Sequence, residues 1–119
     1  MAAKILVVDD QASMCWILAK ILEGVGLATE AAATGKDALA LVTAGDFAAA
    51  IIDYRLPDMN GLELFLQMQA RQVRLPAFLI TSYGSNALRH EALKLGFRGY
   101  FDKPFSNQLL VDAILTALA

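Results

Sequence analysis

The sequence is poor in the residues that mark secreted, zinc-stapled or membrane-spanning proteins. It contains a single cysteine, Cys15, and a single histidine, His90. One thiol cannot form an internal disulfide, and the two residues together cannot supply the four ligands of a structural zinc site. The apolar run at residues 5–8 ends at Asp9, which is far too short for a signal-peptide core or a membrane span. We therefore expect a cytoplasmic protein with no membrane partner.

Positive charge is also scarce and dispersed. The 10 Lys and Arg residues stand singly along the chain against 12 Asp and Glu residues, and the formal net charge is -2. A protein that grips a nucleic-acid backbone needs clustered basic residues to neutralise the phosphates. We expect no direct nucleic-acid binding by this segment.

What the sequence has in excess is apolar residues. Hydrophobic residues make up 57% of the chain, which exceeds the globular average and indicates elements that are buried on more than one side. The length of 119 residues is enough for one core without disulfides or a structural metal. The chain is therefore expected to form one domain over residues 1–119.

Short apolar segments of strand length alternate with segments of helical periodicity along the whole chain. The expected strands are residues 4–8, 27–31, 48–52, 77–81 and 99–101. The expected helices are residues 12–24, 35–44, 61–71, 86–95 and 106–118. This alternation predicts a parallel sheet with helices on both faces.

The strength of each apolar run predicts the order of the strands. The first, third and fourth runs are continuously apolar, whereas the second (ATEAA) and the fifth (GYF) are weaker or shorter. Continuous runs suit the interior of a sheet and weak runs suit its edges. The expected fold is therefore α/β, a doubly wound, flavodoxin-like sheet of five parallel strands in the order 2-1-3-4-5.

The first predicted helix carries an apolar stripe and, beside it, a tryptophan. The stripe has the i, i+3, i+4, i+7, i+8 spacing of one helical face and is formed by Met14, Ile17, Leu18, Ile21 and Leu22. Cys15 and Trp16 lie beside this stripe and are expected to form a partner-docking position, with Trp16 at least partly exposed. The alternative is that Trp16 only covers a neighbouring helix.

Polar residues follow the predicted strands where ligands bind in this class of sheet. Asp9 and Asp10 follow the first strand, Asp53 follows the third, Thr81 ends the fourth and Lys103 follows the fifth. In doubly wound sheets the ligand site lies outside the carboxyl ends of the strands. These residues are therefore expected to come together.

Three converging carboxylates need positive charge between them, because each otherwise raises the pKa of the others. Lys103 supplies one charge, and a hard divalent cation with oxygen ligands, Mg²⁺ by preference, supplies two. A carboxylate in such a site can attack phosphorus while the lysine and the metal ion absorb negative charge. The pattern therefore favours phosphoryl acceptance.

The chain resembles, from end to end, the receiver (CheY-like) domain of bacterial two-component response regulators. The resemblance rests on the Asp9–Asp10 pair and on three segments: DYRLPDMNG at residues 53–61, TSYG at residues 81–84 and YFDKPF at residues 100–105. Each motif alone is weak, but together, in this order and at strand ends, they are specific.

The resemblance implies a role for each site residue. Asp53 would be the phosphoacceptor, Asp10 a direct Mg²⁺ ligand and Asp9 a ligand acting mainly through water. The backbone carbonyl of Arg55 would complete the metal site. The remaining roles concern the phosphoryl group and the switch: Thr81 and Lys103 would hold phosphoryl oxygens, Tyr100 would be the aromatic switch, and the Lys103–Pro104 peptide would be cis.

The resemblance also implies the partners. A histidine kinase or a histidine phosphotransfer protein would be the donor. The output would pass to an attached domain or to a homodimer through the face of the fourth helix, fifth strand and fifth helix. The chain would assist only its own phosphorylation and dephosphorylation, and it would not otherwise be an enzyme.

Two other functions remain open at this point. A phosphatase of the haloacid dehalogenase type also uses an aspartate nucleophile, but it requires a second Asp two residues later, where this chain has Arg55. A flavodoxin-like cofactor-binding module would need a phosphate-binding loop after the first strand, where the sequence Asp-Asp-Gln would repel a phosphate.

Overall fold

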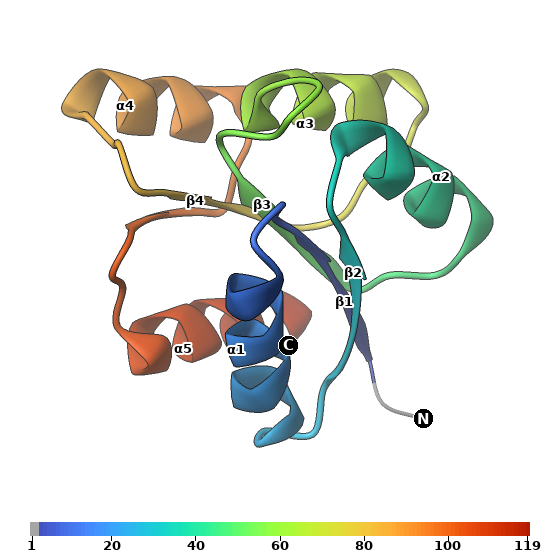
Figure 1. Cartoon of the computed structure of the whole chain (residues 1–119), viewed down its shortest axis with the longest axis vertical. Coiled ribbons are helices and arrows are strands. Elements are labelled where there is room, and N and C mark those ends of the chain that lie inside the picture. The colour runs from blue at the N-terminus through green and yellow to red at the C-terminus, as the bar shows by residue number, and fades with distance from the viewer. Residues whose placement is uncertain (1–2) are drawn as a thin grey trace.

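The computed structural model describes residues 3–119, so the start of the predicted domain at Met1 lies outside the described residues. Strands and helices alternate throughout (Figure 1). The strands are β1 (Lys4–Val8), β2 (Ala28–Ala32), β3 (Ala49–Asp53), β4 (Ala77–Thr81) and β5 (Gly99–Asp102). The helices are α1 (Ala12–Glu23), α2 (Gly35–Ala44), α3 (Gly61–Ala70), α4 (Asn86–Leu95) and α5 (Asn107–Leu118).

The five strands form one parallel sheet in the order β2-β1-β3-β4-β5, as predicted. The boundaries differ from the expected ones by one residue at several ends. The difference that bears on function is in β3, where Asp53 pairs with Ile80 as the last residue of the strand. Its carboxylate therefore starts from a backbone that is paired with β4.

The helices cover the two faces of the sheet and enclose two separate cores. In Figure 1, α1 and α5 lie on one face, and α2, α3 and α4 lie on the other. Alternate residues of the central strands point to opposite faces, so Ile51 joins the core under α1 and α5 while Ile52 joins the core under the other three helices. Both residues are fully buried, which explains why β3 reads as an unbroken apolar run.

Most helices begin at a side-chain cap. Thr34, Ser85 and Ser106 accept hydrogen bonds from backbone N–H groups in the first turns of α2, α4 and α5. Asn60 and Glu63 form a reciprocal capping box at the start of α3. These caps define where each helix begins, and therefore how the preceding loop leaves the carboxyl end of the sheet.

The apolar stripe of α1 is narrower than the sequence predicted. Leu18 and Leu22 are fully buried, but Ile17 is 42% exposed. Ile17 belongs to the stripe but lies outside the buried face, because α1 packs on the sheet and against α5 through its Leu18 and Leu22 side. Trp16 is 63% exposed, which confirms its predicted exposure. Among residues 3–119, no helix has the length and apolar character needed to cross a membrane.

Candidate functional site

The polar residues predicted to converge do so at the carboxyl ends of the strands. Asp9, Asp53 and Thr81 are buried, at 1%, 7% and 1% exposure. Burial of two carboxylates in one place is unfavourable unless they are paired with positive charge. These residues therefore mark a functional site more clearly than any exposed cluster would.

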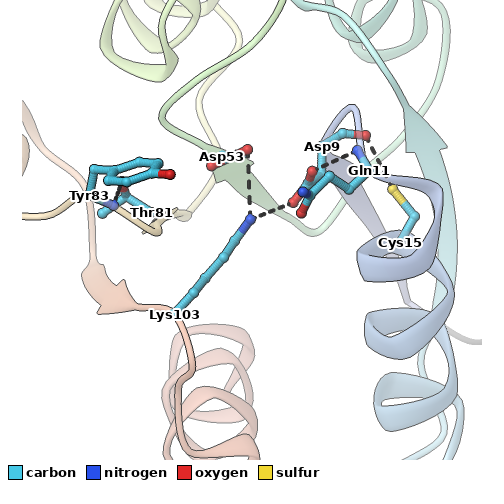
Figure 2. A network of polar contacts seen from close by, with 7 residues as sticks. All are labelled: Asp9, Gln11, Cys15, Asp53, Thr81, Tyr83 and Lys103. Atoms are coloured by element: carbon cyan, nitrogen blue, oxygen red, sulfur yellow. Dashed lines mark hydrogen bonds and ion pairs between the residues drawn. The ribbon is translucent and has the colours of Figure 1, made fainter.

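Lys103 provides the charge that pairs with both buried carboxylates. Its Nζ lies 3.0 Å from Asp9 Oδ2 and 3.7 Å from Asp53 Oδ2, and Figure 2 shows the side chain reaching between them. The Lys103 N–H donates to the carbonyl of Thr81 at 2.7 Å, which fixes the backbone from which the side chain starts. The Lys103–Pro104 peptide is cis, as expected.

The three carboxylates can offer ligands to one metal ion. Asp9, Asp10 and Asp53 each present an oxygen within 4.8 Å of the others. Oxygen ligands from carboxylates, with open space for water, are what a hard divalent cation such as Mg²⁺ requires. A cavity of about 170 Å³ lies beside the cluster, lined by Asp10, Asp53, Thr81 and Lys103 among others, and it leaves room for a small anionic group.

The carboxyl group of Asp53 does not ionise as readily as an ordinary aspartate. Burial, and then the nearby negative charge of Asp9, raise its pKa to about 6. Lys103 and a hydrogen bond from the backbone N–H of Arg55 act in the opposite direction but do not cancel this rise. A cation bound to the cluster would favour the ionised form, so metal binding would be coupled to the ionisation of Asp53.

Comparison with known proteins decides the family. The response regulator receiver domain family matches residues 5–115 of the chain. The chain belongs to this family. As a member, it is a receiver of two-component signal transduction, and such receivers interact with histidine kinases and output domains. The match favours this function over the phosphatase and the flavodoxin-like module.

Named relatives show the same likeness. The receiver is 36% identical to the transcriptional regulatory protein ZraR of Salmonella typhimurium over 97% of this chain, which spans 26% of ZraR. It is 32% identical to sporulation initiation phosphotransferase F of Bacillus subtilis over 96% of this chain and 92% of that protein. A CheY-like receiver structure from Methanospirillum hungatei JF-1 superposes with a TM-score of 0.91 at 30% identity, covering 99% of this chain and 94% of the other.

The acidic loop after β1 is held by hydrogen bonds of its own. Asp9 Oδ1 accepts from the backbone N–H of Gln11 at 2.9 Å, and the thiol of Cys15 donates to the Asp9 carbonyl at 3.4 Å. Burial raises the pKa of the Cys15 thiol, with Asp9 adding to the rise. Cys15 thus ties α1 to the acidic loop, as Figure 2 shows.

The loop after β3 returns to the sheet at Gly61, and close packing requires glycine there. A Cβ at this position would lie 2.8 Å from the Asp53 carbonyl oxygen and 2.8 Å from a methyl of Leu79. Backbone conformation does not explain this glycine, because the glycines with positive φ in the described chain are Gly26 and Gly96. Gly61 matters because it lets the loop pass close to the phosphoacceptor candidate.

Asp58 is a structural residue that the sequence interpretation missed. Its two carboxylate oxygens accept from the backbone N–H groups of Gly35 and Lys36, each at 2.9 Å. These hydrogen bonds lower the pKa of Asp58 and tie the loop after β3 to the start of α2. Its partners lie 23 and 22 residues away, so no local pattern in the sequence announces the contact.

Two exposed side chains stand at the mouth of the cavity. The guanidinium of Arg55 lies 4.9 Å from the centroid of the Tyr83 ring, and both residues line the cavity. Tyr83 is 72% exposed. The backbone N–H of Tyr83 donates to the hydroxyl of Thr81 at 3.1 Å, so the exposed loop and the buried hydroxyl are directly connected.

The predicted switch residue, Tyr100, lies outside the cavity lining. Its ring is half-buried against the core under α2, α3 and α4, while its hydroxyl reaches the loop between β4 and α4. Burial and a hydrogen bond to Asp102 raise the pKa of Tyr100, so the hydroxyl is protonated and able to donate at neutral pH.

Proposed function

We propose that Asp53 accepts a phosphoryl group from the phosphohistidine of a histidine kinase or a histidine phosphotransfer protein, in a reaction that requires Mg²⁺. The observation that carries this proposal is the placement of Asp53. It is a buried carboxylate with a raised pKa, within 4.8 Å of two further carboxylates and 3.7 Å from a lysine ammonium.

The residues present fit a magnesium ion. Asp10, Asp53 and the backbone carbonyl of Arg55 would hold it directly, and Asp9 would act mainly through water. Bound Mg²⁺ supplies positive charge to the oxygens of the transferring group. The exposed position of Asp10 suits an ion that keeps several of its own waters.

The chain's own residues account for the rest of the transfer. A carboxylate oxygen of Asp53 attacks phosphorus, and the bond between phosphorus and the donor histidine nitrogen breaks. Lys103 exchanges its 3.7 Å contact with Asp53 for a phosphoryl oxygen. The hydroxyl of Thr81 accepts from Tyr83 and keeps its own proton to donate to a second phosphoryl oxygen.

The output of the reaction is conformational. A phosphoryl group adds about −1.5 to −2 charge and three strong acceptor oxygens, which would draw Thr81 toward Asp53 and let Tyr100 pack inward. The face formed by α4, β5 and α5 would change and carry the signal to an output domain or to a second copy of the chain. The receiver turns over no external metabolite and assists only its own phosphorylation and dephosphorylation.

We further propose that Trp16 docks the donor protein. It is 63% exposed on α1, the helix that begins directly after the acidic loop. Large aromatic residues at the centre of an interface dominate binding energies. Cys15 is partly buried and its thiol bonds to the Asp9 carbonyl, so the docking proposal rests on Trp16.

The proposal also covers the domain boundaries, nucleic-acid binding and cellular location of the receiver. We retain a single domain over residues 1–119, with no direct nucleic-acid binding by this segment. The cytoplasmic location stays a prediction. Any activity of a longer protein, such as the transcriptional regulation named for ZraR, would come from parts beyond the 26% of that relative that this chain spans.

The test is covalent labelling by a small phosphodonor. Wild type, Asp53→Asn and Asp112→Asn are incubated with acetyl phosphate, with Mg²⁺ or with a chelator. Asp112 is an exposed carboxylate on α5 and provides the matched control. We expect labelling of wild type and Asp112→Asn in Mg²⁺ only, and none of Asp53→Asn. Undiminished Mg²⁺-dependent labelling of Asp53→Asn would refute the assignment.

A further inference from the structure

The hydroxyl of Tyr100 is held between two partners from different parts of the chain. It accepts a hydrogen bond from the backbone N–H of Ser85 at 3.2 Å, and it donates to Asp102 Oδ1 at 3.0 Å. Ser85 caps α4 through its side chain, whereas Tyr100 and Asp102 belong to β5. The hydroxyl therefore joins the start of α4 to the edge strand.

The space occupied by these groups exists because residue 84 is a glycine. A Cβ built on Gly84 would overlap both the Tyr100 hydroxyl oxygen and Asp102 Oδ1. Gly84 is not among the residues with positive φ, so backbone conformation does not explain it. Because Gly84 has no side chain, the Tyr100 hydroxyl and the Asp102 carboxylate can form their hydrogen bond next to the loop.

The contact adjoins two residues of the phosphorylation site. Asp102 pairs with Thr81 in the sheet, and the next residue, Lys103, donates its N–H to the Thr81 carbonyl. The loop from Thr81 to Ser85 thus has the site hydroxyl at one end and the Tyr100 contact at the other. A shift of Thr81 toward Asp53 would move this loop relative to β5.

We propose that Asp102, the Ser85 N–H and Gly84 form a latch that holds the Tyr100 hydroxyl at the surface and biases the receiver toward its unphosphorylated arrangement. This inference rests on the proposed function and deepens it, because it assigns Asp102 and Gly84 as positioning residues for the switch. None of the latch residues lines the cavity beside the acidic cluster.

The bias follows from the free energy needed to break the hydrogen bonds of the Tyr100 hydroxyl with Ser85 and Asp102. A hydrogen bond to an ionised acceptor is among the stronger kinds, and two bonds must break for Tyr100 to leave. A ligand shifts a two-state equilibrium only through its differential affinity for the two states. If the latch stabilises the arrangement that the phosphoryl mimic does not prefer, it lowers the apparent affinity of the receiver for that mimic. Loosening the latch should therefore tighten the binding of a phosphoryl mimic.

The first experiment measures the affinity for beryllofluoride in Mg²⁺ by calorimetry. Wild type is compared with Asp102→Ala, Tyr100→Phe and the double variant. We expect each single variant to bind roughly three- to tenfold more tightly, which corresponds to the loss of about one such hydrogen bond. We expect the double variant to match the single ones, because each change opens the same latch.

The double variant also separates the latch from simple electrostatics. Removing the negative charge of Asp102 could by itself favour an anion, but that effect would persist in the Tyr100→Phe background, where no hydroxyl is present. Additive gains would therefore overturn the latch, as would unchanged affinity in the single variants. Gly84→Ala, whose methyl group displaces the hydroxyl, should tighten binding to a similar extent, and weaker binding would count against the proposal.

The second experiment needs no phosphoryl mimic. The amide resonance of Ser85 and the ring resonances of Tyr100 are recorded by NMR in the free chain. They should shift in Asp102→Ala and stay in place in Asp112→Ala, the control on α5; if they do not move in Asp102→Ala, the latch is refuted. Failure of the wild-type chain to bind beryllofluoride would instead refute the proposed function, and with it the bias.

Discussion

The site of this receiver has two halves that differ in burial and in the forces that hold them. The buried half, formed by Asp9, Asp53, Thr81 and Lys103, is shielded from water and held by ion pairs. The exposed half, formed by Tyr83, Gly84, Ser85 and Asp102 together with the Tyr100 hydroxyl, is held by hydrogen bonds and one aromatic contact at the surface.

This difference suits the buried half to the chemical step and the exposed half to the conformational response. Shielding strengthens every charge interaction in the buried half, which is what a nucleophilic carboxylate and a charge-absorbing lysine require. Each contact of the exposed half contributes only about 0.5–3 kcal/mol, so the loop can exchange it when the charge of the buried half changes. Thr81 connects the two halves, because its hydroxyl is buried and yet bonded to the backbone of Tyr83.

The largest effect is expected from removing the positive charge of the buried half. Lys103→Ala should slow labelling by acetyl phosphate by about a hundredfold or more, since one electrostatic contact to a developing anion has about that value. Lys94→Ala, an exposed lysine on α4, is the matched control. Equal rates in wild type and Lys103→Ala would show that the buried half does not provide the charge stabilisation.

Substitution of Trp16 should reveal a surface that only a protein donor uses. Truncating an aromatic anchor costs about 2 kcal/mol or more, so Trp16→Ala should slow phosphotransfer from the donor protein by roughly thirtyfold. The rate from acetyl phosphate should not change, because this small molecule makes no contact with α1. Equal losses with both donors would mean that the tryptophan is structural.

The pH dependence of metal binding tests the raised pKa of Asp53. Mg²⁺ competes with the proton for this carboxylate, and the pKa of the free group is about 6. The apparent Mg²⁺ affinity should therefore fall by about tenfold per pH unit once the pH drops below that value, as measured by titration from pH 8 to pH 5. An affinity that stays level down to about pH 4 would indicate an ordinary aspartate.

The smallest effect is expected in the exposed half. Tyr83→Ala removes an exposed ring and its contact with Arg55, which has a value of about 0.5–1 kcal/mol at such a site. We expect urea unfolding to show a loss of no more than about 0.5–1 kcal/mol in stability. A loss as large as that from a buried core residue would contradict the division into two halves.

The sequence predicted the sheet and the buried half of the site well. Ile51 and Ile52 belong to a run that is apolar on both faces, so the sequence predicted the interior position of β3. Once the strand order was predicted, the polar residues that end the strands were expected at the same edge of the sheet. Ile17 shows the limit of this reasoning, because helical periodicity gives a face but not the width of its contact with the sheet.

The contacts that sequence reasoning missed are tertiary ones. Asp58 caps α2 across 23 residues, and Asp102 meets the Tyr100 hydroxyl only because Gly84 leaves room above the loop. None of these residue types is unusual where it stands in the sequence. Their roles depend on how two loops approach each other after the sheet has formed.

The stability of Asp53→Asn, compared with wild type in the absence and presence of Mg²⁺, tests the central claim most directly. The folded-state pKa of Asp53, about 6, lies above its ordinary value of 3.8. Its contribution to stability is therefore present below about pH 4 and is lost as the pH rises through about 6. At pH 7.5 the ionised group should destabilise the fold by about 2 kcal/mol.

Without Mg²⁺, the account predicts that Asp53→Asn has the higher free energy of unfolding at pH 7.5, and that this advantage vanishes near pH 4. With saturating Mg²⁺, wild type should gain stability through binding, and the difference should shrink or reverse. A wild-type chain that is the more stable of the two without Mg²⁺, or equal stabilisation of both chains by Mg²⁺, would contradict the claim that the buried carboxylates of this receiver form a metal-dependent phosphorylation site.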